Sequence, residues 1–104
     1  MRRFEEAKTL LRRTLPVALR VLGEGKETTL RMRTIYASAL YLDIGATLAN
    51  LREAVTTLED VERIARRVLG GAHPLAVVIE RSLRNARATL RAHEELQEVR
   101  KTIS

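Results

Sequence analysis

The sequence predicts an all-α protein, and three features support that prediction. Only 3% of the 104 residues are aromatic, whereas β-sandwiches and barrels draw heavily on aromatic and β-branched side chains. Gly and Pro, which mark the turns between short strands, number only 5 and 2. Apolar residues recur every three or four positions, and no stretch alternates as a strand would. At this length we expect a single domain over 1–104, with four main helices and a C-terminal helical tail.

The first helix is expected over about residues 3–22. Gly23 and Gly25 end it, because glycine is favoured where a helix terminates. Pro16 lies inside this segment and removes a backbone hydrogen bond, so we expect a kink or a division into two helical pieces. The apolar positions of the segment follow helical spacing: Phe4, Ala7, Leu11, Leu15, Ala18 and Leu22.

The second and third helices are separated by the sequence Asp-Ile-Gly-Ala at residues 43–46. The second is expected from residues 26–28 to about Leu42, and the third over about 48–69. Gly70 and Gly71 end the third helix. Its apolar residues form a sustained amphipathic stripe: Leu51, Ala54, Val55, Leu58, Val61, Ile64, Ala65 and Val68.

The fourth helix is expected to begin at His73-Pro74, because proline suits the first helical turn. It should reach about Arg91. A weaker, polar continuation through residues 93–104 is expected to form a helical tail that caps the stack.

The chain contains an internal repeat with a shift of 47 residues, which places Gly23 on Gly70. Residues 4–23 and 51–70 are identical at nine of twenty positions. The repeated unit is therefore a helical hairpin, which buries its apolar face by stacking on neighbouring hairpins. The sequence divides into a half repeat (1–23), a full repeat (24–70), a half repeat (71–92) and the polar tail (93–104). We expect an α-solenoid of about two repeats.

Both junctions of this repeat carry recognisable motifs. Residues 69–77, LGGAHPLAV, resemble the LG-x-x-HP-x-T-L junction of kinesin-light-chain-type tetratricopeptide repeats (TPRs). Residues 22–30, LGEGKETTL, are similar, with Lys26 and Glu27 in the places of His and Pro. Residues 35–41 and 51–54 resemble the NLA-x-x-L-Y and Y-x-E-A stretches of the two repeat helices. The resemblance covers about residues 4–92, but the period is longer than usual and Ile35 replaces the expected Asn.

This resemblance implies a protein–protein interaction module or scaffold that binds a peptide in a concave groove. In such solenoids the first helix of each hairpin lines the groove. The resemblance carries the groove positions over to Arg31, Thr34, Ser38, Tyr41 and Leu42 in the second helix. In the fourth helix it carries them over to Val78, Arg81, Asn85, Ala88 and Thr89. Arginines beside hydroxyl and amide groups suit a partner that carries carboxylates.

The net charge of +6 raises nucleic acid, particularly RNA, as an alternative ligand. However, the arginines come as pairs and singles among glutamates, without aromatic residues to stack on bases, so nucleic-acid binding is not expected. A purely structural segment that self-associates is a third alternative. The first helix carries apolar residues on more than one face, which predicts further repeats before it or dimerisation through it.

Other functions find no support in the sequence. The chain has no Cys and only two His, so we expect no metal site and no cofactor. No stretch is long and apolar enough for a membrane span, and no secretory leader is apparent. We therefore expect a cytoplasmic protein. Adjacent carboxylates on helices point in different directions and suit acid–base catalysis poorly, so no enzyme activity is expected.

Overall fold

The computed structural model describes residues 2–103, which form four α-helices and no strand. Their bounds are Arg2–Leu22 (α1), Glu27–Tyr41 (α2), Leu48–Val68 (α3) and Pro74–Ile103 (α4). The predicted all-α class is confirmed. Residues 1 and 104, the ends of the expected first half repeat and of the tail, lie outside the described part.

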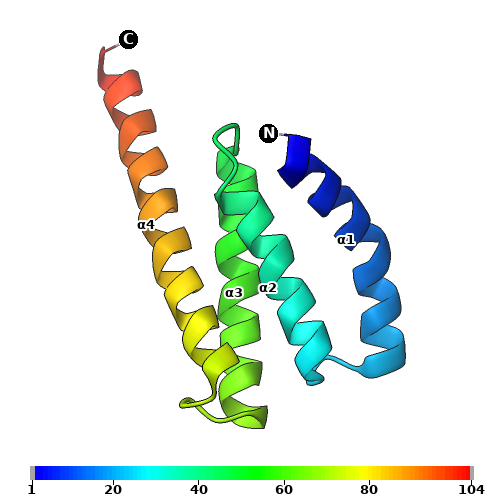
Figure 1. Ribbon diagram of the computed structural model, residues 1–104. Coiled ribbons are helices and arrows are strands. Elements are labelled where there is room, and N and C mark those ends of the chain that lie inside the picture. Colours follow the sequence, from blue (N-terminus) through cyan, green and yellow to red (C-terminus); the bar gives the residue numbers. More distant parts are fainter. Residues whose placement is uncertain (1, 104) are drawn as a thin grey trace.

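The helices form a flat array in which α2 occupies the central position (Figure 1). α2 packs against α1, α3 and α4, and α3 also packs against α4, whereas α1 contacts α2 alone. The array measures 49 × 29 × 18 Å, so its thinnest dimension is less than two helix diameters. Much of each helix surface therefore lies close to solvent.

Two glycines at equivalent positions of the internal repeat end α1 and α3. Gly23 and Gly70 have φ angles of 87° and 91°, in the left-handed region that glycine enters without steric cost. The Gly23 N–H donates to the carbonyl of Leu19 (3.1 Å), and the Gly70 N–H donates to that of Arg66 (3.2 Å). α2 and α4 then begin at Glu27 and Pro74. The sequence repeat thus coincides with a repeat of helix ends.

The structure corrects two expectations about helix continuity. α1 runs through Pro16 as one helix, with the proline ring exposed to solvent. α4 does not stop near Arg91 but continues to Ile103, because no Gly or Pro interrupts a run of good helix formers after Pro74. The expected tail is therefore the last part of α4.

The hydrophobic core lies where α2, α3 and α4 meet. α3 contributes a buried stripe that faces α2 on one side and α4 on the other. α1 adds Leu11 to this core, with Leu15 packed partly against it. The largest apolar side chains that are fully buried are Leu30, Leu40, Leu51, Leu58, Val61, Ile79 and Leu83.

Candidate binding face formed by α2 and α4

The exposed side of α2 carries a stripe of mixed chemistry. Residues spaced by three or four positions share one side of a helix, and here Arg31, Ile35, Ser38 and Leu42 share the outer side. Ile35 and Leu42 are 51% and 54% exposed. These two large apolar side chains therefore meet solvent on the helix that occupies the centre of the array.

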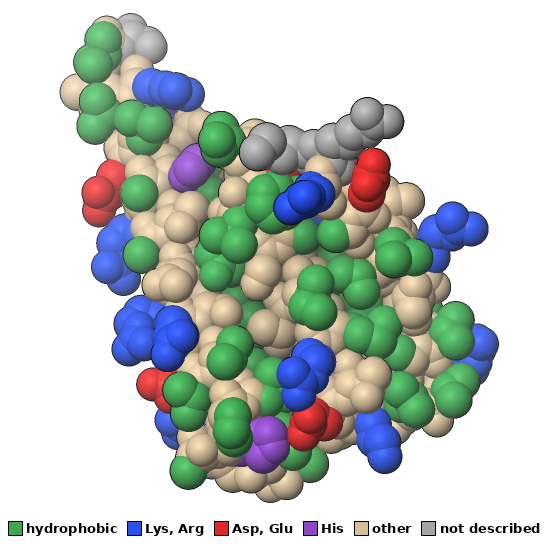
Figure 2. Space-filling model, in the orientation of Figure 1, with side chains coloured by type: hydrophobic (Ala, Val, Ile, Leu, Met, Phe, Trp, Pro, Cys, Tyr) green, Lys and Arg blue, Asp and Glu red, His purple; other side chains and the backbone are tan. Residues whose placement is uncertain are grey.

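A hollow of about 540 Å³ lies between this stripe and the start of α4. Ile35 and Val78 contribute exposed apolar surface to it, and Arg31 and Glu27 bring opposite charges to its edge. Figure 2 shows hydrophobic side chains gathered across this side of the molecule, with charged side chains around them. Its lining comprises Glu27, Arg31, Thr34, Ile35, His73, Pro74, Leu75 and Val78.

Three polar side chains fix the edge of the hollow. The Arg31 guanidinium donates to the Glu27 carboxylate across 2.7 Å, a contact that lowers the pKa of Glu27. The backbone N–H of Leu75 donates to Nδ1 of His73 (3.0 Å), so neutral His73 carries its proton on Nε2. That Nε2 lies 3.4 Å from Glu27 Oε1. His73 therefore joins the first turns of α2 and α4 across the hollow.

A second hollow, of about 300 Å³, adjoins the first on the side of α1. Ile35 lines both hollows and therefore forms the ridge between them. Ser38 and Phe4 belong to the second hollow alone. The candidate face thus extends from α4 across α2 to α1. The second hollow is lined by Arg3, Phe4, Ala7, Ile35, Ser38 and Ala39.

The structure brings only some of the expected groove residues together. Arg31 and Thr34 line the first hollow and Ser38 lines the second. Tyr41 is buried in the core, and Thr34 is also buried, with its hydroxyl donating to the carbonyl of Leu30 (2.8 Å). The surface stripe of α2 therefore keeps Arg31, Ser38 and Leu42 but has Ile35 in the place of Thr34, because one residue rotates a side chain by about 100°.

Of the expected groove residues of α4, Val78 lines the first hollow, whereas those further along the helix lie apart from it. Arg81 and Asn85 are exposed, and neither lines either hollow. The backbone carbonyl of Asn85 accepts a hydrogen bond from the Thr89 hydroxyl (3.0 Å). The first hollow is also lined by Ile35 and His73, which were not among the expected groove residues. Ile35 lies four residues after Arg31 and three before Ser38, so helical spacing alone could have placed it on the exposed side of α2.

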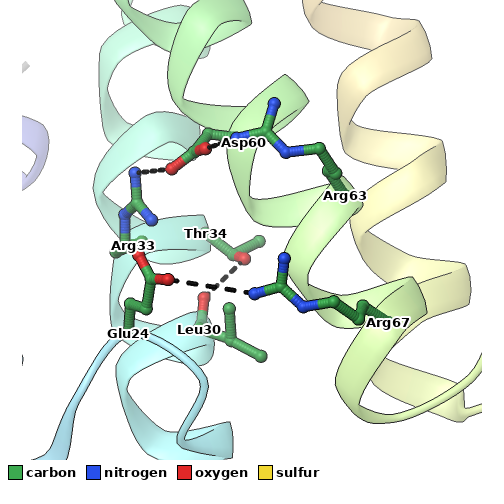
Figure 3. A network of polar contacts seen from close by, with 7 residues as sticks. All are labelled: Glu24, Leu30, Arg33, Thr34, Asp60, Arg63 and Arg67. Atoms are coloured by element: carbon green, nitrogen blue, oxygen red, sulfur yellow. Dashed lines mark hydrogen bonds and ion pairs between the residues drawn. The ribbon is translucent and has the colours of Figure 1, made fainter.

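The opposite side of α2 is occupied by polar contacts to α3. Arg33, two residues before Ile35 and thus about 200° around the helix, donates to Asp60 across 2.9 Å. Asp60 also pairs with Arg63, as Figure 3 shows. Nearby, Arg67 lies 3.8 Å from Glu24. These contacts fix the orientation of α2 and so keep Ile35 directed away from α3.

Tyr36 links three helices on this inner side. Its hydroxyl donates to the Glu53 carboxylate of α3 (2.6 Å) and accepts from Nε of Arg12 on α1 (3.2 Å). Burial, with the bond to Glu53, raises the pKa of Tyr36. The phenol therefore stays neutral and can donate at physiological pH.

The described residues show no feature of a metal centre or of a membrane span. No group of three His, Asp or Glu side chains in 2–103 is arranged to hold a metal ion. Within the same range, no helix combines the length and apolar character that crossing a membrane requires. Compared with known proteins, the chain matches no family model, no curated protein and no solved structure.

Proposed function

We propose that this chain is a non-enzymatic interaction module of the TPR type, which binds an extended peptide segment across the α2–α4 face. The observation that carries the proposal is the hollow bounded by Ile35, Val78 and the Arg31–Glu27 pair. An exposed apolar recess with a few fixed polar groups at its edge is the usual form of a peptide or ligand site. Support for the solenoid arrangement comes from the equivalent glycines that end α1 and α3.

The chemistry of the hollow defines the segment that would bind. Ile35 and Val78 provide apolar surface for one large aliphatic or aromatic side chain. Arg31 is exposed and can form a bidentate contact with a carboxylate of the peptide. Because Glu27 already neutralises part of the charge on Arg31, the expected ligand has one acidic residue beside the apolar one rather than an acidic run.

A displayed library of random dodecapeptides tests this proposal directly. The wild-type protein should enrich peptides that carry a bulky apolar residue next to Asp or Glu. Binding of the selected peptides, measured by fluorescence anisotropy, should weaken at least tenfold in Ile35→Glu and Val78→Glu. The variant Arg31→Gln should weaken the acidic peptides and spare their Asp→Asn and Glu→Gln versions.

Ile44→Glu provides the matched control, because Ile44 is 90% exposed and lies outside the hollow. It introduces the same charge on the same residue type and should leave peptide affinity unchanged. If no peptide is enriched, or if Ile35→Glu and Ile44→Glu bind the selected peptides equally well, the proposal fails.

Polyanion binding by the arginines of α4 is the second candidate. Arg84, Arg87 and Arg91 line a hollow of about 350 Å³, but Glu62 and Glu80 line it as well. Arg87 is moreover paired with Glu59 of α3 across 2.9 Å. A single-stranded RNA oligonucleotide distinguishes this candidate, because binding through six phosphates would weaken roughly 300-fold between 50 and 200 mM salt.

A further inference from the structure

α1 and α3 are equivalent helices of the internal repeat, but α1 lacks one of the two neighbours that α3 has. α3 packs against α2 on one side and α4 on the other, whereas α1 packs only against α2. The shift of 47 residues places Val17 on Ile64. Ile64 is 2% exposed and Val17 is 45% exposed. The side of α1 that corresponds to the α2-facing side of α3 is therefore open.

This open side of α1 has the spacing of a helix-packing seam. Its members alternate between steps of three and four residues, as the a and d positions of a heptad do. Leu10 and Val21 on this stripe are more than 60% exposed. We call it the α1 stripe: Ala7, Leu10, Thr14, Val17 and Val21.

A second exposed seam lies at the other end of the chain. α4 runs nine residues past Glu94, whose carboxylate lies 3.6 Å from Arg52 of α3, and its end projects beyond the other helices (Figures 1 and 2). Leu96 and Val99 are each 51% exposed there, and Ile103 is exposed as well. We call Ala92, Leu96, Val99 and Ile103 the α4 stripe. Its steps of four, three and four residues match those of the α1 stripe.

We propose that the occupant of the α1 stripe is the projecting end of α4 from a second copy of this chain, packed antiparallel to α1. An antiparallel pair in which Leu96 meets Val17 and Val99 meets Thr14 brings the remaining apolar residues together as well. Ala92 then faces Val21, and Ile103 faces Leu10. Each seam thereby covers apolar side chains that are exposed on the isolated chain.

The charges beside the two stripes favour this arrangement and orientation. The border of the α1 stripe away from α2 carries Arg13 and Arg20. Antiparallel packing places this border against the side of α4 that carries Glu95, beside Arg20. Parallel packing would instead place Arg13 and Arg20 against the side of α4 that carries Arg100, so that like charges would meet. Opposite charges at such flanking positions select both partner and orientation.

The alternative pairing of two α1 helices covers less apolar surface. Antiparallel packing about Leu10 and Thr14 would set Arg13 against Arg13 of the other copy and Glu6 against Arg20, so the flanking charges partly offset one another. It would leave Leu96, Val99 and Ile103 exposed on both copies. The pairing of α1 with α4 covers both stripes and is therefore favoured.

Mixing two variants tests the pairing. Wild-type protein should form complexes larger than the 11.8 kDa monomer at high micromolar concentration in light scattering. The double variant Leu10→Glu/Val17→Glu and the double variant Leu96→Glu/Val99→Glu should each be monomeric and folded by circular dichroism. Because each retains the stripe that the other lost, an equimolar mixture should form a 1:1 complex.

A charge exchange provides a second test that leaves both apolar stripes intact. Arg20→Glu and Glu95→Arg should each weaken association several-fold. The chain that carries both substitutions should regain affinity, because each interface again contains an opposite pair.

The outcomes separate this inference from the proposed function. Val78→Glu should abolish peptide binding and leave association unchanged, since Val78 lies outside both stripes. A wild-type chain that stays monomeric near 1 mM would overturn the inference. It would also fail if Leu96→Glu/Val99→Glu associated as the wild type does, or if the two variants did not combine.

Discussion

α1 and α3 are two versions of one repeated segment, and they differ mainly in how much of each is covered. Leu11 and Leu58 are equivalent and both buried, because both helices have a neighbour on that side. Val17 and Ile64 are also equivalent, yet only Ile64 is covered. Similar helix sequences thus reach different degrees of burial because the array supplies different neighbours. The stability of each helix depends on its neighbours more than on its own composition.

The largest expected difference between the two helices comes from placing a carboxylate at equivalent positions. Ile64→Asp buries a charge in the hydrophobic core without a partner, which should cost more than about 4 kcal/mol and leave the chain largely unfolded. Val17→Asp should cost less than about 1 kcal/mol, since Val17 already meets solvent. Urea unfolding followed by circular dichroism measures both, and equal losses would refute the difference.

A smaller contrast is expected from cavities at the shared buried position. Leu58→Ala removes a fully buried side chain between helices on both sides and should cost about 3–5 kcal/mol. Leu11→Ala should cost about 2 kcal/mol, because α1 has only one neighbour and the site can relax. Thermal unfolding measures the stability lost by each variant. Equal losses would mean that the second neighbour of α3 does not account for the expected difference.

Removing one hydroxyl tests how α1 is tied to α3. Tyr36→Phe eliminates the bonds to Glu53 and Arg12 and should lower stability by about 1 kcal/mol. Tyr41→Phe is the control, since Tyr41 is similarly buried in the same helix and, within residues 2–103, the structure shows no hydrogen bond to its hydroxyl. Comparable losses in the two variants would mean that the link through Tyr36 contributes nothing.

The smallest expected effect is a pH dependence of stability. It comes from the contact between Asp43, which follows α2, and Lys8 of α1. The carboxylate of Asp43 accepts from the Gly45 N–H (3.0 Å) and lies 3.6 Å from buried Lys8 of α1. These contacts lower the pKa of Asp43 below its usual 3.8, the Gly45 bond contributing most. A lowered carboxyl pKa stabilises the fold above the unfolded value, and this contribution disappears as pH falls through the folded value.

The stability of the wild type should therefore exceed that of Asp43→Asn at pH 7 and approach it below pH 4. Chemical unfolding at a series of pH values measures this difference. A difference that stays constant from pH 7 to pH 2 would show that the carboxylate charge has no part in holding α1.

The sequence was sufficient to predict the four helices and the glycines that end α1 and α3. Gly23 and Gly70 act locally, and an amphipathic stripe needs only its own residues to be recognised. The end of α4 was predicted less well, because the polar residues after Arg91 were expected to continue the helix only weakly, as a tail. Helix propensity alone carries the helix to Ile103.

The candidate face could be predicted only in part. Helical spacing identified the residues that share a side of α2, but the rotation of α2 relative to its neighbours depends on tertiary contacts. Arg33 to Asp60 and Tyr36 to Glu53 set that rotation, and they join residues 27 and 17 positions apart. The rotation directs Ile35 outward and buries Thr34 and Tyr41.

The order of contacts in the array has a kinetic consequence. α1 meets α2, α2 meets α3 and α3 meets α4, so neighbours in the chain are neighbours in space, with α2 and α4 as the one more distant pair. Chains with such local contacts have a low contact order, and helical proteins of this kind fold in microseconds to milliseconds. The hairpin of α3 and α4 can close before α1 has found α2, because no contact of α1 is needed for it. The part of the fold built from α2, α3 and α4 can therefore form without α1, which joins it through its single helix interface with α2.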